Sequence, residues 1–492
     1  MTLHSPPLRS PSPEAGPATA SPHRLDLITA AGGALLFAVA AVAGTAIEHT
    51  TGSLRAPWPP LLARWMPHLG PGTPTALLVA ALVVLYGPTV AARLPWRHLT
   101  WTAWLSAMAW TWSLALVDGW RTGVADRLTT RYEYLRGISR FADIPAALRE
   151  FSQHIPGGVP GSWQPHIAGH PPGAVLTFVG LDRIGLGGGG WAGAFCIVTG
   201  SSVAAAVLVA LRALGAEHTA RAAAPFLVLA PAAVWVGTSA DGYFAAVAAW
   251  ALALLAVAAG RGGRGGGAAV AALGSGLLFG ATLYVSYGLT LMVLPALAVL
   301  VCARTARPVP PAALGLAAVA VTFTLLGFRW WEAYPLLVER YYHGSGGLRS
   351  YGYWVWGNLA CVVLCSGLAA VAGARRVLAA VPYVVRQRWR WRSPAVGAAR
   401  SGPVPEPVDA VSPLSVAGRL APLVLITCAV LTALLVADLS GMSKAETERI
   451  WLPFTLWLPA AAALLPSGGQ RGWLAAQAAL ALLTNHLLLT YW

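Results

Sequence analysis

Titratable side chains gather in one stretch of this chain, between two long apolar blocks. The stretch runs from Asp118 to Gly173 in a chain of which only 10% is charged. Carboxylates can act as general bases, and arginines bind phosphate oxygens through paired hydrogen bonds. Connections between helices are mostly short and need few such groups, so we interpret the stretch as the front of an active site at a membrane surface. Its titratable residues are Asp118, Asp126, Glu133, Asp143, Glu150, Arg121, Arg127, Arg131, Arg136, Arg140, Arg149, His154, His166 and His170.

The composition predicts an integral membrane protein. Of the 492 residues, 57% are hydrophobic and 10% are charged, against about 25% charged in soluble domains. Backbone groups in lipid must be satisfied internally, and the apolar blocks have the length of helices rather than of barrel strands. We therefore expect an all-α, polytopic fold. The net charge of +15 is carried almost wholly by arginine, which is typical of cytoplasmic loops and does not indicate a nucleic-acid partner.

Apolar segments long enough to cross a bilayer recur along the chain, since a span takes roughly 20 residues. The piece 172–186 is shorter, carries Asp182 and Arg183 and ends in a run of glycines. We expect it to be a half-helix that enters the membrane without crossing it. The expected spans, about thirteen in all, are 27–46, 75–93, 100–118, 191–211, 222–239, 242–260, 268–286, 288–304, 311–328, 353–373, 419–438, 451–466 and 472–490.

Arginine bias sets the expected orientation. With the N-terminus in the cytoplasm and 172–186 not crossing, the arginine-rich connections face the cytoplasm, and 119–171, 329–352 and 439–450 face outward. If 172–186 crossed, the later arginines would face outward instead. We therefore expect a disordered cytoplasmic tail 1–26, N-terminal transmembrane helices 27–118, an extracytoplasmic catalytic loop and half-helix 119–186, a transmembrane core 187–373, a basic cytoplasmic loop 374–418 and C-terminal transmembrane helices 419–492.

Two histidines and one acid on the predicted outer face have the chemistry of a site. His166 and His170, four residues apart, can bind phosphate as cations or orient a hydroxyl as neutral rings. They can equally be interfacial histidines before a Pro-Pro helix start. Asp241 lies at a predicted helix–helix turn, where an acid is costly unless it is paired or hydrated. It is either functional or the N-cap of the following helix.

Two later outer segments also carry charge. Arg340, His343 and Arg349 surround a glycine turn whose backbone N–H groups suit a phosphate, although a plain loop is the alternative. Glu448 and Arg449 lie where the chain re-enters the membrane. Arg449 can face a lipid phosphate there, or extend harmlessly to the interface.

Taken in order, these motifs resemble the membrane glycosyltransferases of the GT-C superfamily, which include relatives of protein O-mannosyltransferase and lipid A aminoarabinose transferase. Those families carry an acidic pair in the first outer loop, a Lys/His-Pro-Pro motif, a Ser–x–Asp turn and a late Arg–Tyr–aliphatic–Pro element. The resemblance covers roughly 118–466. This chain departs from it in having Tyr132-Glu133 where the pair stands, and two additional N-terminal spans. The matching stretches here are Glu133-Tyr134, His170-Pro171-Pro172, Ser239-Ala240-Asp241 and Arg449-Ile450-Trp451-Leu452-Pro453.

The resemblance implies roles for individual residues. Glu133 would deprotonate the acceptor hydroxyl, with Asp126 and Asp118 as the other candidates, while arginines stabilise the departing phosphate. An ion pair between Glu133 and Arg136 or Arg140 on a surface helix is the structural alternative. The expected substrate-binding residues are Tyr134, Arg140, His166, His170, Asp241, Arg340, His343, Arg349, Glu448 and Arg449.

The expected function is transfer of a sugar from a polyprenyl-phosphate donor to an envelope glycan, lipid or protein, with inversion. Nucleotide-sugar donors are disfavoured because Walker A and dinucleotide-binding motifs are absent from the sequence. No cofactor is required by the sequence, although a divalent metal is compatible with the site, and no cluster has zinc-ligand spacing. The Ala-, Gly- and Arg-rich composition suggests a bacterial cytoplasmic membrane. A transporter or flippase of a lipid-linked sugar is the alternative function.

Overall fold

The computed structural model describes residues 22–260, 265–390 and 413–491, and helices make up most of them. Strands are almost absent from this part of the chain. Two three-residue strands, β1 (Ala63–Trp65) and β2 (Leu488–Thr490), pair antiparallel and join the segment after the first helix to the end of the chain. The all-α class expected from the composition is confirmed.

Within the described residues, seven helical segments are long and apolar enough to cross a membrane. An eighth would be added if α14 (Val309–Leu325) and α15 (Trp330–His343), which are bent by 75° at their junction, formed one span. The expectation of about thirteen transmembrane helices is therefore wrong. The seven segments lie in α1 (Pro22–Thr51), α2 (Thr73–Arg93), α7 with α8 (Gly189–Ser201 and Val203–Ala213), α11 (Ala240–Ala259), α12 (Gly266–Val285), α18 (Leu368–Arg390) and α19 (Pro413–Leu439).

Several apolar windows fail as spans because glycine and proline divide them. The window 222–239 becomes α9 (Glu217–Val228) and the single turn α10 (Ala233–Val236), separated around Pro231. The window 353–373 is divided at Gly367, whose φ of +89° ends α17 (Tyr351–Ser366) before α18 begins. Other windows give shorter or less apolar helices: α3 (Trp96–Ala115), η7 (Tyr287–Met292), α13 (Val293–Ala303), α20 (Thr447–Ile450), α21 (Leu452–Thr455), η8 (Leu458–Leu464), η9 (Ser467–Gly469) and α22 (Gln470–Leu487).

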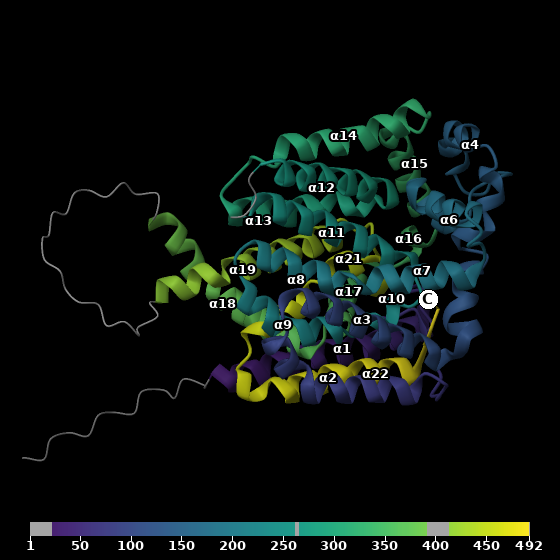
Figure 1. Ribbon diagram of the computed structural model, residues 1–492. Helices are drawn as coiled ribbons and strands as arrows, with labels where there is room; N and C mark the ends of the chain where they lie inside the picture. The colour runs from purple at the N-terminus through teal and green to yellow at the C-terminus, as the bar shows by residue number, and fades with distance from the viewer. Residues whose placement is uncertain (1–21, 261–264, 391–412, 492) are drawn as a thin grey trace, which may run out of the picture.

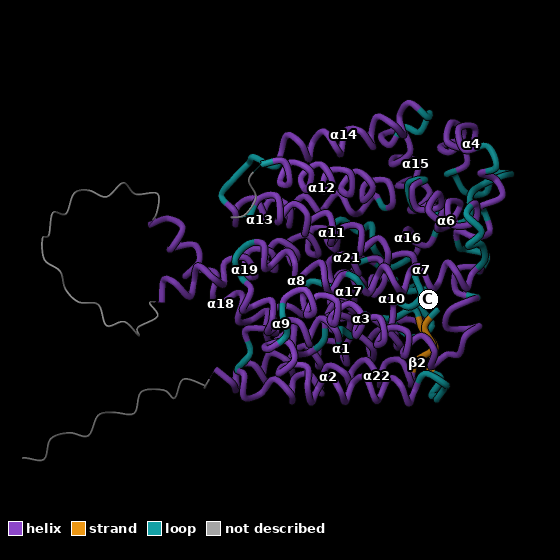
Figure 2. Tube along the Cα trace, viewed as in Figure 1, coloured by secondary structure: helices purple, strands orange, loops and turns teal. Residues whose placement is uncertain are grey.

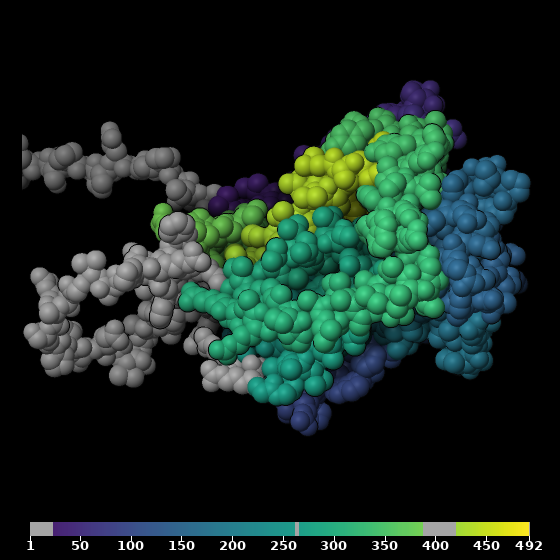
Figure 3. All heavy atoms as spheres, turned by 90° about the horizontal axis from the view of Figure 1, so that it is seen from above, coloured from purple at the N-terminus to yellow at the C-terminus, as the bar shows by residue number. Residues whose placement is uncertain are grey.

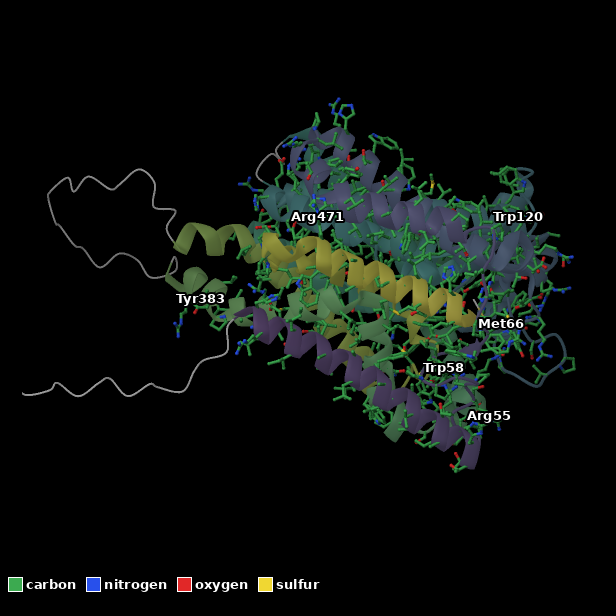
Figure 4. All side chains as sticks on the ribbon, turned by 90° about the horizontal axis from the view of Figure 1, so that it is seen from below. Arg55, Trp58, Met66, Trp120, Tyr383 and Arg471 are labelled. Atoms are coloured by element: carbon green, nitrogen blue, oxygen red, sulfur yellow. The ribbon has the colours of Figure 1, made fainter. Side chains whose placement is uncertain are left out.

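The long helices lie side by side and give the molecule two distinct ends (Figure 1). At one end α1 begins, α18 ends and α19 begins, and Arg471 and Tyr383 lie toward it (Figure 4). At the other end lie α4 (Ile144–Glu150), α6 (Gly173–Arg183) and α16 (Ser345–Leu348), with Trp120 also nearby. We call this the short-helix end, because loops and short helices replace long ones there (Figure 2).

The short-helix end is built largely from 119–171. Of the expected half-helix 172–186, α6 forms 11 residues, about 16 Å at the ordinary helical rise, which is too short to cross a bilayer. Seen from the α14 side, the blue 119–183 segment lies beside the green ridge that contains α15, and the surface is hollowed on the other side of that ridge (Figure 3). The short elements are η1 (Leu116–Asp118), the π-helical turn η2 (Arg121–Ala125), η3 (Arg127–Thr129), η4 (Tyr134–Arg136), η5 (Ile138–Phe141), α4, η6 (Phe151–His154) and α5 (Pro165–Gly169).

Two expected boundaries need correction. The basic loop 374–418 is too wide, because α18 continues to Arg390 and α19 starts at Pro413; the remainder, 391–412, lies outside the described residues. The tail 1–26 is also too long, since α1 begins at Pro22, and 1–21 lies outside the described residues. Asp26 is fully buried and pairs with Arg375 at 2.5 Å and with Arg376 at 2.6 Å. These ion pairs join α1 to α18 at the end opposite the short helices.

Candidate active site

Arg449 is the centre of a buried ionic network at the short-helix end. Its Nη1 donates to Oδ2 of Asp241 at 2.6 Å, and its Nη2 donates to Oε2 of Glu446 at 2.9 Å. The same Nη2 lies 3.0 Å from Nε2 of His166. Arg449 is only 4% exposed, and a guanidinium at that depth is tolerated because carboxylates surround it. Residues separated by almost 300 positions in the chain are thus in direct contact.

Glu133 joins this network through His166. Its Oε1 lies 2.9 Å from His166 Nδ1. Because a guanidinium can only donate, His166 Nε2 must accept from Arg449, which places the ring proton on Nδ1, the nitrogen nearest Glu133. The second carboxylate oxygen of Glu133, Oε2, is buried without a hydrogen-bond partner among the described residues. His166 therefore holds a carboxylate that keeps one oxygen available to accept a proton.

Local structure explains how each group reaches the network. Asp241 lies in the first turn of α11, where the helix dipole favours a negative charge. It does not cap the helix, because the N-cap residue is Ser239, so the N-cap alternative for Asp241 is wrong. His166 lies in the first turn of α5, which begins at Pro165. Glu133 immediately precedes η4, and Arg449 lies in the single turn α20.

Tyr134 and His170 pack behind the network. The hydroxyl of Tyr134 lies 3.0 Å from Nδ1 of His170, and that nitrogen is also 2.8 Å from the carbonyl oxygen of His166. Burial lowers the pKa of His170 to about 4, so its ring is neutral at physiological pH. His170 therefore does not supply a positive charge. It fixes the Tyr134 hydroxyl and the end of α5 instead.

Glu446 links Arg449 to a second arginine. Its Oε1 lies 3.3 Å from Nη2 of Arg349, which in turn donates through Nη1 to the carbonyl oxygen of Lys444 at 2.6 Å. Burial opposes the charged form of Glu446, but Arg449 and Arg349 outweigh it and hold the pKa of this carboxyl below its ordinary value. Sequence reasoning missed both Glu446 and Lys444. One signal was present, because Lys444 is the only lysine in the chain.

The other two candidate bases make different contacts. Asp118 pairs with Arg127 Nη2 and with His68 Nε2, both at 2.7 Å. Arg127 also donates to the carbonyl oxygen of Thr490, so this group fastens the end of the chain to the short-helix end. Asp126 is exposed and lies 3.5 Å from Arg121. Neither Asp118 nor Asp126 contacts the network around Arg449, whereas Glu133 does.

Two predicted substrate-binding arginines support the loop 155–163. Arg340 donates to the carbonyl oxygens of Ile155 at 2.6 Å and Trp163 at 3.0 Å. Arg140 lies over the Trp163 ring, 3.6 Å from its centre, and donates to the carbonyl oxygen of Gly161. Both guanidiniums thus hold backbone in place, and the structure does not bring them to the Arg449 network.

Two further predictions also fall outside the network. His343 is exposed and lies 3.9 Å from the Glu339 carboxylate. Glu448 is fully buried and accepts from the backbone N–H of Leu62 at 3.1 Å, so it faces the 58–65 segment rather than the Arg449 network. Burial raises the pKa of Glu448 to about 7. Of the predicted substrate-binding residues, His166, Asp241, Arg349 and Arg449 belong to the network, with Tyr134 and His170 behind it.

Within 22–260, 265–390 and 413–491, no group of three or more His, Cys, Asp and Glu side chains is arranged to hold a metal ion. The network's carboxylates instead face arginine and histidine. Comparisons with protein-family models, curated proteins and solved structures found no match to this chain.

Proposed function

We propose that this chain is an integral membrane glycosyltransferase of GT-C type. In this proposal it moves a sugar from a polyprenyl-phosphate donor to an envelope glycan, lipid or protein acceptor on the extracytoplasmic face of a bacterial cytoplasmic membrane. One observation carries the proposal. The short motifs that resemble this superfamily lie far apart in sequence, yet Glu133, Asp241 and Arg449 from these segments meet, through His166, in one buried network.

The proposed reaction is a single displacement at the anomeric carbon. Glu133 accepts the proton of the acceptor hydroxyl as that oxygen forms a bond to the anomeric carbon of the donor sugar. The bond between this carbon and the phosphate oxygen breaks, and the phosphate leaves with the electron pair. Attack opposite the leaving group inverts the anomeric configuration. His166 keeps the Glu133 carboxylate in position and is itself held by Arg449.

The leaving phosphate needs positive charge that is fixed before the reaction begins. Arg449 and Arg349 provide it, because both guanidiniums meet at Glu446 and are nearly buried. Asp241 holds Arg449 from its other side at 2.6 Å, which restricts the rotation of the guanidinium. In this arrangement His166, which contacts the base, and Glu446, at the phosphate site, share Nη2 of Arg449.

The position of the network supports an outer-face reaction. It lies at the short-helix end, and Arg471 lies toward the opposite end (Figure 4). Basic residues concentrate in cytoplasmic connections of membrane proteins. If Arg471 faces the cytoplasm, Glu133 and Arg449 face the extracytoplasmic side. Transfer from a lipid-linked sugar to an envelope acceptor takes place on that side.

The test is cleavage of a lipid-linked sugar by the purified full-length protein in lipid vesicles. Polyprenyl-phosphate donors with mannose, glucose, galactose or arabinose are supplied with alkyl glycoside acceptors, and release of polyprenyl phosphate and the new glycoside is measured by mass spectrometry. Glycoside formation with inverted configuration is expected from one donor. Movement of an intact lipid-linked sugar between leaflets, with no cleavage of any donor, would instead establish the transporter alternative.

A further inference from the structure

The turn that carries Glu446 has an unusual backbone. Ala445 and Glu446 are consecutive non-glycine residues with positive φ, at +68° and +63°. Side chains disfavour this left-handed region, so two in a row persist only where the surroundings impose them. This strained turn places the Glu446 carboxylate between Arg349 and Arg449, which indicates that the position of Glu446 matters for function.

Lys444 anchors the turn to the segment that carries Arg349. Its N–H donates to the hydroxyl of Tyr341 at 3.0 Å, and its carbonyl oxygen accepts from Arg349. Its Nζ donates to the carbonyl oxygen of Gly346 at 2.8 Å, close to the rings of Tyr342 and Tyr351. The turn is therefore fixed on one side, while the Glu446 carboxylate is held by its contacts with Arg349 and Arg449.

Arg349 presents an incompletely used binding edge to Glu446. Nε and Nη2 form the edge of a guanidinium that binds two oxygens of a carboxylate or a phosphate together. In this protein Nη2 is 3.3 Å from Glu446, and Nε is buried without a hydrogen-bond partner in the part of the chain that the structure describes. Arg349 is 92% buried, because only 8% of it is exposed. A tetrahedral anion with several oxygens would satisfy both N–H groups.

Glu446 is also the most exposed carboxylate of the network. Its side chain is 20% exposed, against 8% for Glu133 and 4% for Asp241. Asp241 and Glu133 are less accessible to solvent. An anion that approaches the two arginines therefore meets Glu446 first.

Charge balance decides whether the donor phosphate binds beside Glu446 or replaces it at the two arginines. A phosphodiester between a sugar and a prenyl chain carries one negative charge, as a carboxylate does. Added beside Glu446, it would leave an uncompensated negative charge at a buried site, which is costly. Exchanged for Glu446, it leaves the balance unchanged. The network already holds three carboxylates, Glu133, Asp241 and Glu446, and its two guanidiniums are those of Arg349 and Arg449.

We propose that Arg349 and Arg449 form the binding site for the phosphate ester of the donor, and that the Glu446 carboxylate occupies it until the donor displaces it. This inference rests on the proposed function and adds to it a side chain that competes with the donor phosphate for Arg349 and Arg449. Donor binding costs the two Glu446–arginine contacts and gains bidentate phosphate contacts on the same arginines. Product release is assisted because Glu446 can return to both.

The test is binding of two phosphate probes to the full-length protein in detergent micelles, measured by calorimetry. Farnesyl phosphate probes the lipid ester, inorganic phosphate probes the headgroup chemistry alone, and farnesol is the uncharged control. Glu446→Gln should bind farnesyl phosphate about tenfold or more tightly than the wild type, because a charged competitor is gone. Arg349→Gln should bind it about tenfold or more weakly. Glu339→Gln, which removes an exposed carboxylate of α15, is the matched control and should not change binding.

Each outcome has a defined meaning. Tightening of farnesyl phosphate binding supports the exchange, and tightening of both probes assigns the recognition to the phosphate group itself. Weaker or unchanged binding by Glu446→Gln, in a wild type that binds farnesyl phosphate and transfers sugar, overturns the exchange but not the proposed function. A wild type that binds no prenyl phosphate overturns both. Glu446→Ala, with thermal unfolding recorded alongside, repeats the test if the glutamine variant folds poorly.

Discussion

Removing Arg449 should reveal how strongly the buried network depends on one cation. Arg449→Met keeps much of the side-chain volume and leaves Asp241, 3% exposed, without the only ion pair it forms in the described structure. Breaking a buried pair by removing one partner costs about 3–5 kcal/mol. Asp241→Asn should cost a similar amount, because it removes one of the carboxylates that compensate Arg449.

The double variant is the informative one. When both charges are gone, no uncompensated ion remains from this pair, so the two losses should not add. We expect the double variant to be more stable than the sum predicts by about 2 kcal/mol, within the 0.5–3 kcal/mol typical of residues in contact. Reversible unfolding in mixed micelles of dodecyl maltoside and SDS measures all four proteins.

An exposed pair gives the matched control. Arg329 and Glu332 are 2.9 Å apart with side chains 58% and 50% exposed, so their cycle should give a coupling of only about 0–1 kcal/mol. If the losses at Arg449 and Asp241 add within about 0.3–0.5 kcal/mol, the two residues are not coupled. That result would refute the network as described.

Three further changes probe the surroundings of the network. The free energy of unfolding should fall as pH rises from 4.5 to about 7, because in this range the folded protein retains the Glu448 proton that the unfolded chain releases. Above pH 7 the contribution of Glu448 no longer changes with pH. Glu448→Gln should flatten that slope in unfolding measured across pH; an unchanged slope would mean that Glu448 titrates normally. Arg340→Ala removes two backbone anchors and should speed amide exchange in 155–163, and equal exchange rates would contradict its anchoring role. Asp118→Asn leaves Arg127 buried without its carboxylate, so it should lower the free energy of unfolding by about 3–5 kcal/mol without abolishing turnover. A variant that stays stable but has no turnover would make Asp118 the base.

The sequence predicts the ingredients of the site better than their roles. Charged and titratable residues are scarce in this apolar chain, and this scarcity singles out Glu133, His166, Asp241 and Arg449. The structure brings these four side chains together in the network. Arg340 and His343 do not join them. Both lie on α15, where Arg340 reaches the loop 155–163 and His343 is exposed. Nothing in a linear segment shows which side of a bent helix faces the site.

Two other features were beyond sequence reasoning for physical reasons. Glu446 reaches the arginines through a left-handed turn at Ala445 and Glu446, and no glycine or asparagine stands there to indicate it. Counting apolar windows also overestimated the number of spans. Apolar composition does not show where a helix breaks, and a positive φ at Gly367 or a turn at Pro231 divides a window that is otherwise uniformly apolar.

The most direct test of the account is the turnover of Glu133→Gln. The amide keeps the size of the side chain but cannot accept the acceptor's proton, so donor binding should be retained while sugar transfer falls by about 10²–10⁴-fold. Single-turnover transfer from the polyprenyl-phosphate donor, with Asp126→Asn as the exposed-carboxylate control, separates the two effects. Near-normal transfer by Glu133→Gln, with transfer lost in Asp126→Asn, would contradict the assignment of Glu133 as the base.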